Sequence, residues 1–106
     1  MTNSSVTISS ATTAVTVTRN NSYRYGNIVF IGVRFTVTES ISIYGNVVQL
    51  PSTLKCPTDV YAPLMSSYFT TMDGKGLYMD SNSYTFRASS AIPSGNYTFY
   101  CPVLVN

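Results

Sequence analysis

A regular two-residue alternation of apolar and polar side chains is the feature that most restricts what this chain can fold into. From Val29 to Val37 every second residue is Val, Ile or Phe, and polar residues such as Arg34 and Thr36 lie between them. The same period recurs from Tyr97 to Val105. Because successive side chains of a strand point to opposite faces of a sheet, this period predicts strands with one buried face.

Shorter alternations extend the pattern over most of the chain. They occur around Val6–Ile8 and Val15–Val17, and Ile41 and Ile43 continue the parity of the run that starts at Val29. A helix has little support, because β-branched residues and Tyr are abundant while Ala, Leu, Glu and Lys are scarce. We therefore predict an all-β chain.

Clusters of turn-forming residues separate the predicted strands. Gly, Asn, Asp, Ser or Pro gather at 20–21, 26–27, 44–46, 80–83 and 93–96. The run Asp73-Gly74-Lys75-Gly76 predicts a hairpin turn, since glycine adopts positive φ without strain. This hairpin would join a strand at Tyr68–Met72 to one at Leu77–Met79.

One segment, Leu50–Leu64, lacks the alternation. It holds Pro51, Pro57 and Pro63, and Pro has no N–H to donate to a neighbouring strand, so we predict a surface crossover loop there. The whole pattern predicts a two-sheet antiparallel β-sandwich, jelly-roll-like, with about eight strands. Residues 1–13 are expected as an N-terminal extension or a short first strand, and residues 14–106 as the sandwich domain.

Two of the predicted strands carry apolar residues on both faces. Ile28 and Phe30 lie on the polar side of the first long run, and Tyr100 and Leu104 lie on the polar side of the last one. In an isolated chain these residues would form an exposed apolar patch. Either the long loop or the N-terminal segment covers them, or they form a subunit interface.

The charge content limits the classes of partner. Charged residues make up 9% of the chain, against about 25% in a typical soluble domain. The net charge of +2 arises without a basic cluster, since Arg19 and Arg24 lie close in sequence whereas Arg34 and Arg87 are isolated. A nucleic-acid-binding surface needs several cations on one face, so the composition argues against one. No apolar run approaches the ~20 residues of a membrane span, and we expect no membrane insertion.

The start of the chain has neither the basic residues nor the apolar run of a signal peptide. We expect synthesis in the cytoplasm, or a fragment of a longer protein. In the cytoplasm Cys56 and Cys101 are expected as free thiols, whereas an oxidising compartment would let them pair. Cys101 shares the parity of the apolar residues of the last strand, which predicts a buried side chain.

Catalytic chemistry has few candidate residues. The chain has no His, which excludes Ser-His-Asp and Cys-His nucleophile systems and every His-ligated metal site. Its acids are Glu39, Asp59, Asp73 and Asp80, and the last two occupy predicted turns, where Asp commonly bonds to nearby backbone. We predict a protein that is not an enzyme and that uses no cofactor or metal.

Tyrosine is the residue type that most favours a binding function. The chain has nine Tyr and five Phe but no Trp. A Tyr side chain offers an apolar ring for stacking and a hydroxyl for hydrogen bonding, and a saccharide needs both. The densest polar and aromatic stretch provides the predicted saccharide-binding residues, which are Asp73, Lys75, Tyr78, Asp80, Asn82 and Arg87.

The order of several short motifs between Tyr25 and Asn106 suggests a family. Gly26-Asn27 precedes an aliphatic strand, Leu50-Pro51 begins a proline-containing loop, and Pro93-Ser94-Gly95 precedes the last strand. With the glycine-containing turn between them, these motifs resemble the small C-terminal receptor-binding domains of bacteriophage tail fibres and baseplate proteins.

The resemblance implies a homotrimeric β-sandwich on the phage tail, assembled in the host cytoplasm, that binds a host cell-surface saccharide without catalysis. It fixes no saccharide-binding residue, because the binding loops are the variable part of such domains. A trimer would give the apolar residues Ile28, Phe30, Tyr100 and Leu104 an interface to occupy. Two other functions stay open, namely a monomeric carbohydrate-binding or adhesin-like module and a purely structural virion protein.

Overall fold

The structure is a computed structural model that describes residues 3–66 and 71–106, with the backbone alone for residues 71–74. The described residues form strands and no helix, so none of them belongs to a helix long and apolar enough to cross a membrane. The prediction of an all-β chain is confirmed. In chain order the strands are β1 (Asn3–Ser5), β2 (Ser9–Ser10), β3 (Val15–Asn20), β4 (Tyr23–Tyr25), β5 (Ile28–Val37), β6 (Asn46–Gln49), β7 (Val60–Ser66), β8 (Thr71–Met79), β9 (Thr85–Ala88) and β10 (Gly95–Leu104).

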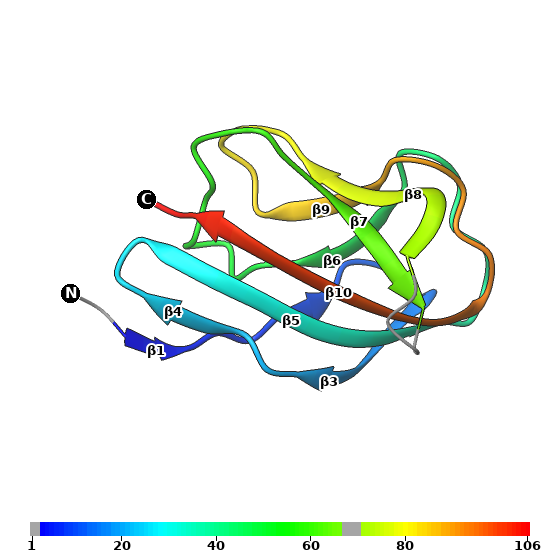
Figure 1. The fold of residues 1–106 in the computed structure, drawn as a ribbon, viewed down its shortest axis with the longest axis horizontal. Coiled ribbons are helices and arrows are strands. Elements are labelled where there is room, and N and C mark those ends of the chain that lie inside the picture. Colours follow the sequence, from blue (N-terminus) through cyan, green and yellow to red (C-terminus); the bar gives the residue numbers. More distant parts are fainter. Residues whose placement is uncertain (1–2, 67–70) are drawn as a thin grey trace.

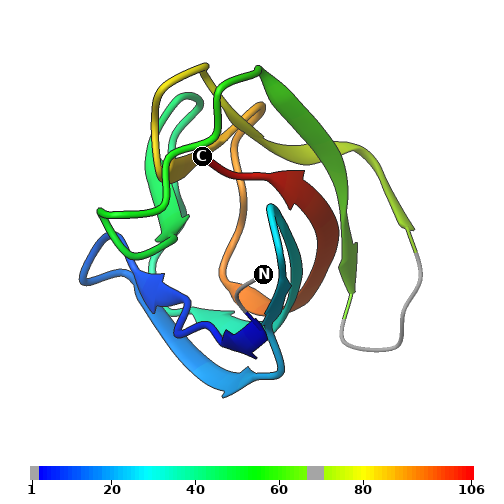
Figure 2. The same cartoon turned by 90° about the vertical axis from the view of Figure 1, so that its left-hand side faces the viewer.

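These strands form one antiparallel sheet that curls round on itself (Figure 1). Neighbouring strands follow the order β1-β4-β5-β10-β7-β8-β9-β6-β2, and β3 pairs with β5 as well. Figure 2, which looks along the long axis, shows the strands arranged around a central axis. We predicted two sheets and about eight strands, whereas hydrogen bonds join ten described strands in a single sheet.

Residues 3–10 connect the two ends of this curled sheet. β1 pairs with β4 at one end, and β2 pairs with β6 at the other. Val6 and Ile8, between the two short strands, are buried in the core. The side-chain amide of Asn20 donates to the carbonyl of Val6 at 2.7 Å, which holds this crossing in place. The N-terminal segment therefore packs on the same core as the rest, while the domain boundary after residue 13 stays a prediction.

The core lies inside the curl, and the alternation of the sequence decides which residues enter it. The odd-numbered residues of β5, and those of β10 from Tyr97 onwards, are buried, as predicted. The rings of Phe86 and Phe99, both fully buried, meet edge to face with centroids 5.1 Å apart. Such a pair adds about 0.5–1.5 kcal/mol to the free energy of burial itself. β10 pairs with β5 along its whole length, from Gly95 opposite Val37 to Leu104 opposite Ile28.

The predicted hairpin turn at 73–76 is wrong. β8 runs without a break from Thr71 to Met79, so the two glycines lie within a strand, and part of the predicted strand Tyr68–Met72 falls outside the described residues. Gly76 serves close packing, because a Cβ there would lie 2.7 Å from the hydroxyl of Tyr61. The sequence pattern did not distinguish a glycine that makes space from one that makes a turn.

The predicted loop at Leu50–Leu64 is too long, because β7 begins at Val60 and contains Pro63. Among the described residues, β7 pairs with β10 only at Met65 and Ser66. Pro63 therefore lies outside the part of β7 that pairs with β10. A register shift between Pro63 and Met65 follows on the β8 side. A strand tolerates Pro at such a bulge or at an unpaired edge.

We predicted that the parity of β5 continues to Ile43, and this is wrong. β5 ends at Val37, and Ile41 is buried through an isolated bridge to Ile92. Ile43 is 48% exposed, and the next residue, Tyr44, has a positive φ of 69°. The chain turns here, so residues beyond the bend no longer belong to the strand whose period they share.

Thr98 is an exception to the inside–outside pattern of β10. It shares the outer face with Tyr100, yet its side chain is fully buried between its neighbours Arg34 in β5 and Met65 in β7. Within the described part of the chain, its Oγ1 has no hydrogen-bond partner. A buried hydroxyl without a partner costs about 1–3 kcal/mol.

We therefore expect Thr98→Val to stabilise the protein. Valine keeps the shape and the strand preference of threonine but removes the unsatisfied hydroxyl, so the free energy of unfolding should rise by about 1 kcal/mol. Urea unfolding measures the change. The exposed Thr16 of β3 provides a matched control, and Thr16→Val should have almost no effect. A loss of stability in Thr98→Val would show that the hydroxyl is satisfied.

The two cysteines are free and Cys101 is buried, as predicted, and Cys56 is buried as well. Burial raises the pKa of Cys101 from 9.0 to about 11, and the charge of Cys56 acts in the same direction. The folded protein therefore keeps the Cys101 proton at a pH where the unfolded chain releases it. The resulting stability is fully present below pH 9.0 and is lost as the pH rises through about 11.

The free energy of unfolding should consequently fall more steeply over this pH range in the native chain than in Cys101→Ala. Denaturant unfolding of both proteins at a series of alkaline pH values measures the difference. Slow alkylation of Cys101 in the folded protein by iodoacetamide below pH 9.0 would support a protonated Cys101 thiol. Parallel pH profiles of the two proteins would contradict it.

Candidate functional site

The four predicted interface residues lie together on the outer face of β5 and β10. Ile28, Phe30, Tyr100 and Leu104 are between 41% and 49% exposed. Leu104 lies directly opposite Ile28, and Pro102 lies opposite Phe30. The predicted alternative in which the long loop or the described N-terminal segment covers these residues is therefore wrong.

β4 enlarges this apolar surface with two tyrosines. Tyr23 pairs with Phe30 and Tyr25 with Ile28 across the β4–β5 ladder. The ring centroids of Tyr23 and Tyr25 are 4.7 Å apart, and those of Tyr25 and Phe30 are 5.8 Å apart. We call this surface the aromatic patch, made of Tyr23, Tyr25, Ile28, Phe30 and Leu104. A continuous exposed patch of this kind commonly marks an interaction surface.

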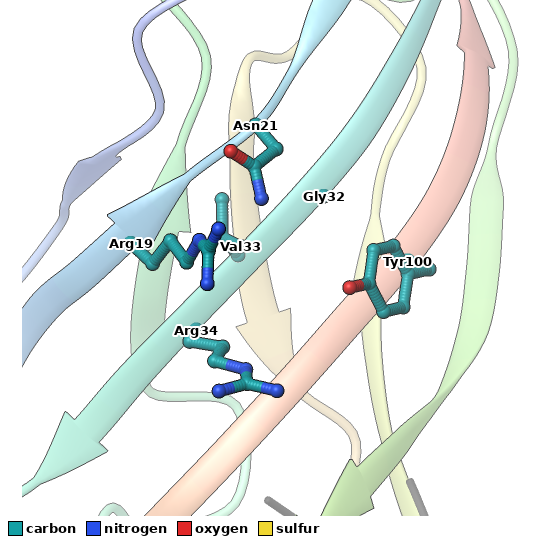
Figure 3. Close-up of a pocket in the computed structure, with 6 residues that line it drawn as sticks. All are labelled: Arg19, Asn21, Gly32, Val33, Arg34 and Tyr100. Carbon is teal, nitrogen blue, oxygen red and sulfur yellow. The ribbon is translucent and has the colours of Figure 1, made fainter.

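Next to the aromatic patch, the same sheet face is hollowed (Figure 3). The hollow has a volume of about 200 Å³. Figure 3 shows Arg19 reaching from β3 towards β5, and the hydroxyl of Tyr100 pointing from β10 towards β5. We call it the arginine hollow; its lining residues are Arg19, Asn21, Gly32, Val33, Arg34 and Tyr100.

A glycine and a tyrosine on neighbouring strands shape the floor of the arginine hollow. Gly32 lies directly opposite Tyr100 in the β5–β10 ladder. A Cβ at position 32 would lie 3.0 Å from Cε1 and 3.2 Å from Cδ1 of the Tyr100 ring. The ring therefore leans over the glycine, and any larger residue at this position would push it away.

A register shift in β3 gives the hollow its first arginine. Val17 pairs with Phe35, so a regular ladder would place Thr18 opposite Arg34 and would turn Arg19 towards the core. The shift between Val17 and Arg19 instead places Arg19 opposite Arg34, on the outer face. Thr18 donates its hydroxyl to the Arg34 carbonyl at 3.2 Å, which fixes the extra residue. β-Bulges commonly redirect a side chain in this way.

The corner between β3 and β4 closes the hollow on another side. Asn21 donates its backbone N–H to the Gly32 carbonyl at 2.8 Å. The Gly32 N–H donates to the buried hydroxyl of Ser22 at 3.0 Å. Both backbone groups of Gly32 are therefore satisfied by the corner, which holds the Asn21 side chain beside the two arginines.

The structure brings together three of the residues predicted from sequence to bind saccharide. Arg87 Nη1 lies 3.9 Å from a carboxylate oxygen of Asp80, and its guanidinium carbon lies 5.6 Å from the centre of the Tyr78 ring. Arg87 Nε also donates to the carbonyl of Tyr44 at 3.0 Å. The Tyr44 ring meets Tyr78 edge to face at 6.3 Å. These side chains satisfy one another, and the sequence analysis did not include Tyr44.

The other three predicted residues are not part of this cluster. Asn82 is exposed in a turn with a φ of 62°, and its N–H donates to the Cys56 carbonyl at 2.6 Å. Lys75 is half-buried in β8, at the parity of Leu77 and thus on the face opposite Tyr78. The side chain of Asp73 lies outside the described residues. No group of three or more Cys, Asp or Glu side chains that could hold a metal occurs in the part of the chain that is described.

Sequence reasoning missed the arginine hollow as a site. It recognised Tyr100 and the polar parity of Arg34, but it treated Arg34 as isolated because its partner Arg19 is distant in sequence. The signal that indicates the pair is the β3–β5 register, which depends on a bulge that has no clear sequence marker. Arg19 also borders a wider depression of about 490 Å³ between residues 7–10 and β3.

Comparisons of the chain with protein-family models, with curated proteins and with solved structures give no match. The two surfaces and the Arg87 cluster therefore have to be judged on their own chemistry. The Arg87 cluster is an internally paired surface group. The arginine hollow and the aromatic patch present their side chains outwards.

We expect Arg87 to contribute more to stability than its ion-pair partner. Arg87→Ala removes the bond to Tyr44 and the contact with the Tyr78 ring as well as the ion pair, and it should cost about 1–2 kcal/mol. Asp80→Asn removes only an exposed ion pair, and it should cost less than about 0.5 kcal/mol. Urea unfolding of both variants tests the ranking. Equal losses would contradict the view that Arg87 joins the Tyr44 turn to β9.

Proposed function

We propose that this chain is a non-catalytic binding domain that recognises a host cell-surface saccharide at the tip of a phage tail fibre or baseplate. The observation that carries the proposal is the arginine hollow, where Tyr100, Asn21 and two arginines face outwards around a glycine floor. A tyrosine ring can stack on the apolar face of a sugar, while amide, hydroxyl and guanidinium groups bond to its polar substituents.

The acids support a binding role over a catalytic one. The carboxylate of Asp59 accepts a hydrogen bond from the Ser81 N–H at 2.8 Å, and that of Asp80 pairs with Arg87. Neither acid lines the arginine hollow. A glycosidase needs two carboxyl groups about 5–9.5 Å apart across the bond that it cleaves. The described residues that line the hollow supply none.

The aromatic patch supports the oligomeric part of the proposal. In this proposal Phe30, Ile28 and Leu104 pack against copies of the same chain in a homotrimer. The hollow would then lie beside the subunit boundary, since Tyr100 adjoins both surfaces. In this proposal the two halves of the curled sheet would take the places of the two sheets of a jelly-roll-like sandwich. Three equivalent sites, repeated over several fibres, would offset a weak affinity at each one.

A glycan array tests the function through Tyr100. Tyr100→Ala should lose most of its binding to bacterial cell-wall saccharides, because stacking on one aromatic ring typically contributes a large share of affinity at such a site. Tyr61→Ala is a matched control. Tyr61 leans over Gly76 as Tyr100 leans over Gly32, and it is likewise exposed, but it lies away from the hollow.

Light scattering on the same samples separates the remaining functions. A species of three times the 11.6 kDa chain mass that also binds saccharide would support the tail-tip function. A monomer that binds saccharide would indicate a free-standing carbohydrate-binding module. A trimer for which neither the wild type nor any variant binds a bacterial saccharide would overturn the proposed receptor function in favour of a structural role.

A further inference from the structure

The chain places two arginines side by side on the outer face. Arg19 and Arg34 are direct cross-strand partners in the β3–β5 ladder. Side chains in this relation have Cβ atoms about 4.5–5.5 Å apart, and like charges placed so destabilise a sheet. The arrangement requires a register shift, because a regular ladder would place the uncharged Thr18 opposite Arg34. The register shift therefore brings two guanidinium side chains to one position of the outer face.

None of the described residues that line the arginine hollow is an acid. Among the described acids, Asp59 and Asp80 are engaged elsewhere, with Ser81 and Arg87. An anion between the two guanidinium groups would be attracted by both of them. Guanidinium groups present a planar fork of N–H donors, which matches the oxygens of phosphate and carboxylate groups.

The other lining residues select the kind of anion. Asn21 contributes an amide and Tyr100 a hydroxyl and a ring face, and neither feature is needed for a bare ion. The hollow, at about 200 Å³, is smaller than the ~300–1,000 Å³ of a pocket for a drug-sized ligand. It suits one charged substituent together with one sugar ring.

We propose that the arginine hollow binds an acidic saccharide, with its phosphate or carboxylate group held between Arg19 and Arg34 and its ring against Tyr100. This inference rests on the proposed function and specifies its ligand. Arg19 and Arg34 provide the charge selectivity, Gly32 provides the room, and Tyr100 provides the recognition of the sugar. A neutral saccharide of the same shape binds much more weakly.

The test is an NMR titration of the ¹⁵N-labelled full chain, followed at the amide of Gly32. The probes are glucose 6-phosphate, glucuronic acid, glucose and inorganic phosphate. We expect the two charged sugars to shift this amide, and whichever binds more tightly identifies the group as phosphate or carboxylate. Glucose should bind about ten- to a hundredfold more weakly, as expected when charge-assisted hydrogen bonds are lost.

Three variants connect the result to the arginine pair. Arg19→Gln should weaken binding of the charged sugars about tenfold or more, and Arg19→Lys, which keeps the charge without the fork, should have a smaller effect. Lys55→Gln removes the same charge at an exposed position next to Asn106, beyond the C-terminal end of β10 and outside the lining of the hollow, and should change little. An unchanged thermal transition in each variant shows that it still folds.

The outcomes separate this inference from the proposed function. Equal binding of glucose and the charged sugars, with no effect of Arg19→Gln, overturns the acidic ligand and leaves saccharide recognition intact. Binding of inorganic phosphate alone overturns saccharide recognition at this site and retains the anion site. Failure of all four probes to shift Gly32, even at high concentration, overturns the assignment of the hollow. Glycan-array binding would then have to come from another surface.

Discussion

The pairing of β5 with β10 is the interaction on which the rest of this structure depends. The ladder runs without a register shift along the whole of β10, and it fixes which side chains of both strands face inwards. Phe35 and Phe99 enter the core on one face, while Phe30 and Tyr100 remain outside on the other. A slip of one residue would exchange the two sets. The same hydrogen bonds thus hold the core together and create the outer surface.

Local departures from regular strand geometry decide what that surface can do. Gly32 allows the Tyr100 ring to lean over the sheet, and Gly76 does the same for Tyr61. Beside Gly32, the bulge in β3 places Arg19 and the corner at Ser22 places Asn21. Their polar side chains line the hollow together with Tyr100. Tyr61 lies opposite Tyr78 of the Arg87 cluster and is not among the residues that line the hollow, so it is a control for the hollow alone.

The low charge of the chain makes the placement of each ionic group informative. Arg87 is held by Asp80, Tyr78 and the Tyr44 carbonyl, so its charge joins a turn to a strand. Arg19 and Arg34 lie opposite each other in the ladder, and both line the hollow. Because two cations line one hollow together with an amide and an aromatic ring, the arginine hollow is a better candidate for a ligand than the cluster predicted from sequence.

The sequence by itself determined the all-β class, the buried parity of β5 and β10, the burial of Cys101 and the outward position of Ile28, Phe30, Tyr100 and Leu104. Each of these follows from a two-residue period, which is a local property of the chain. Only the tertiary structure decided that the strands form one curled sheet, that Pro63 lies in a strand and that Gly76 makes space instead of a turn. It alone placed Arg19 opposite Arg34. Register, bulges and close approach depend on residues that are distant in sequence, and a periodic pattern carries no information about which strand will lie beside which.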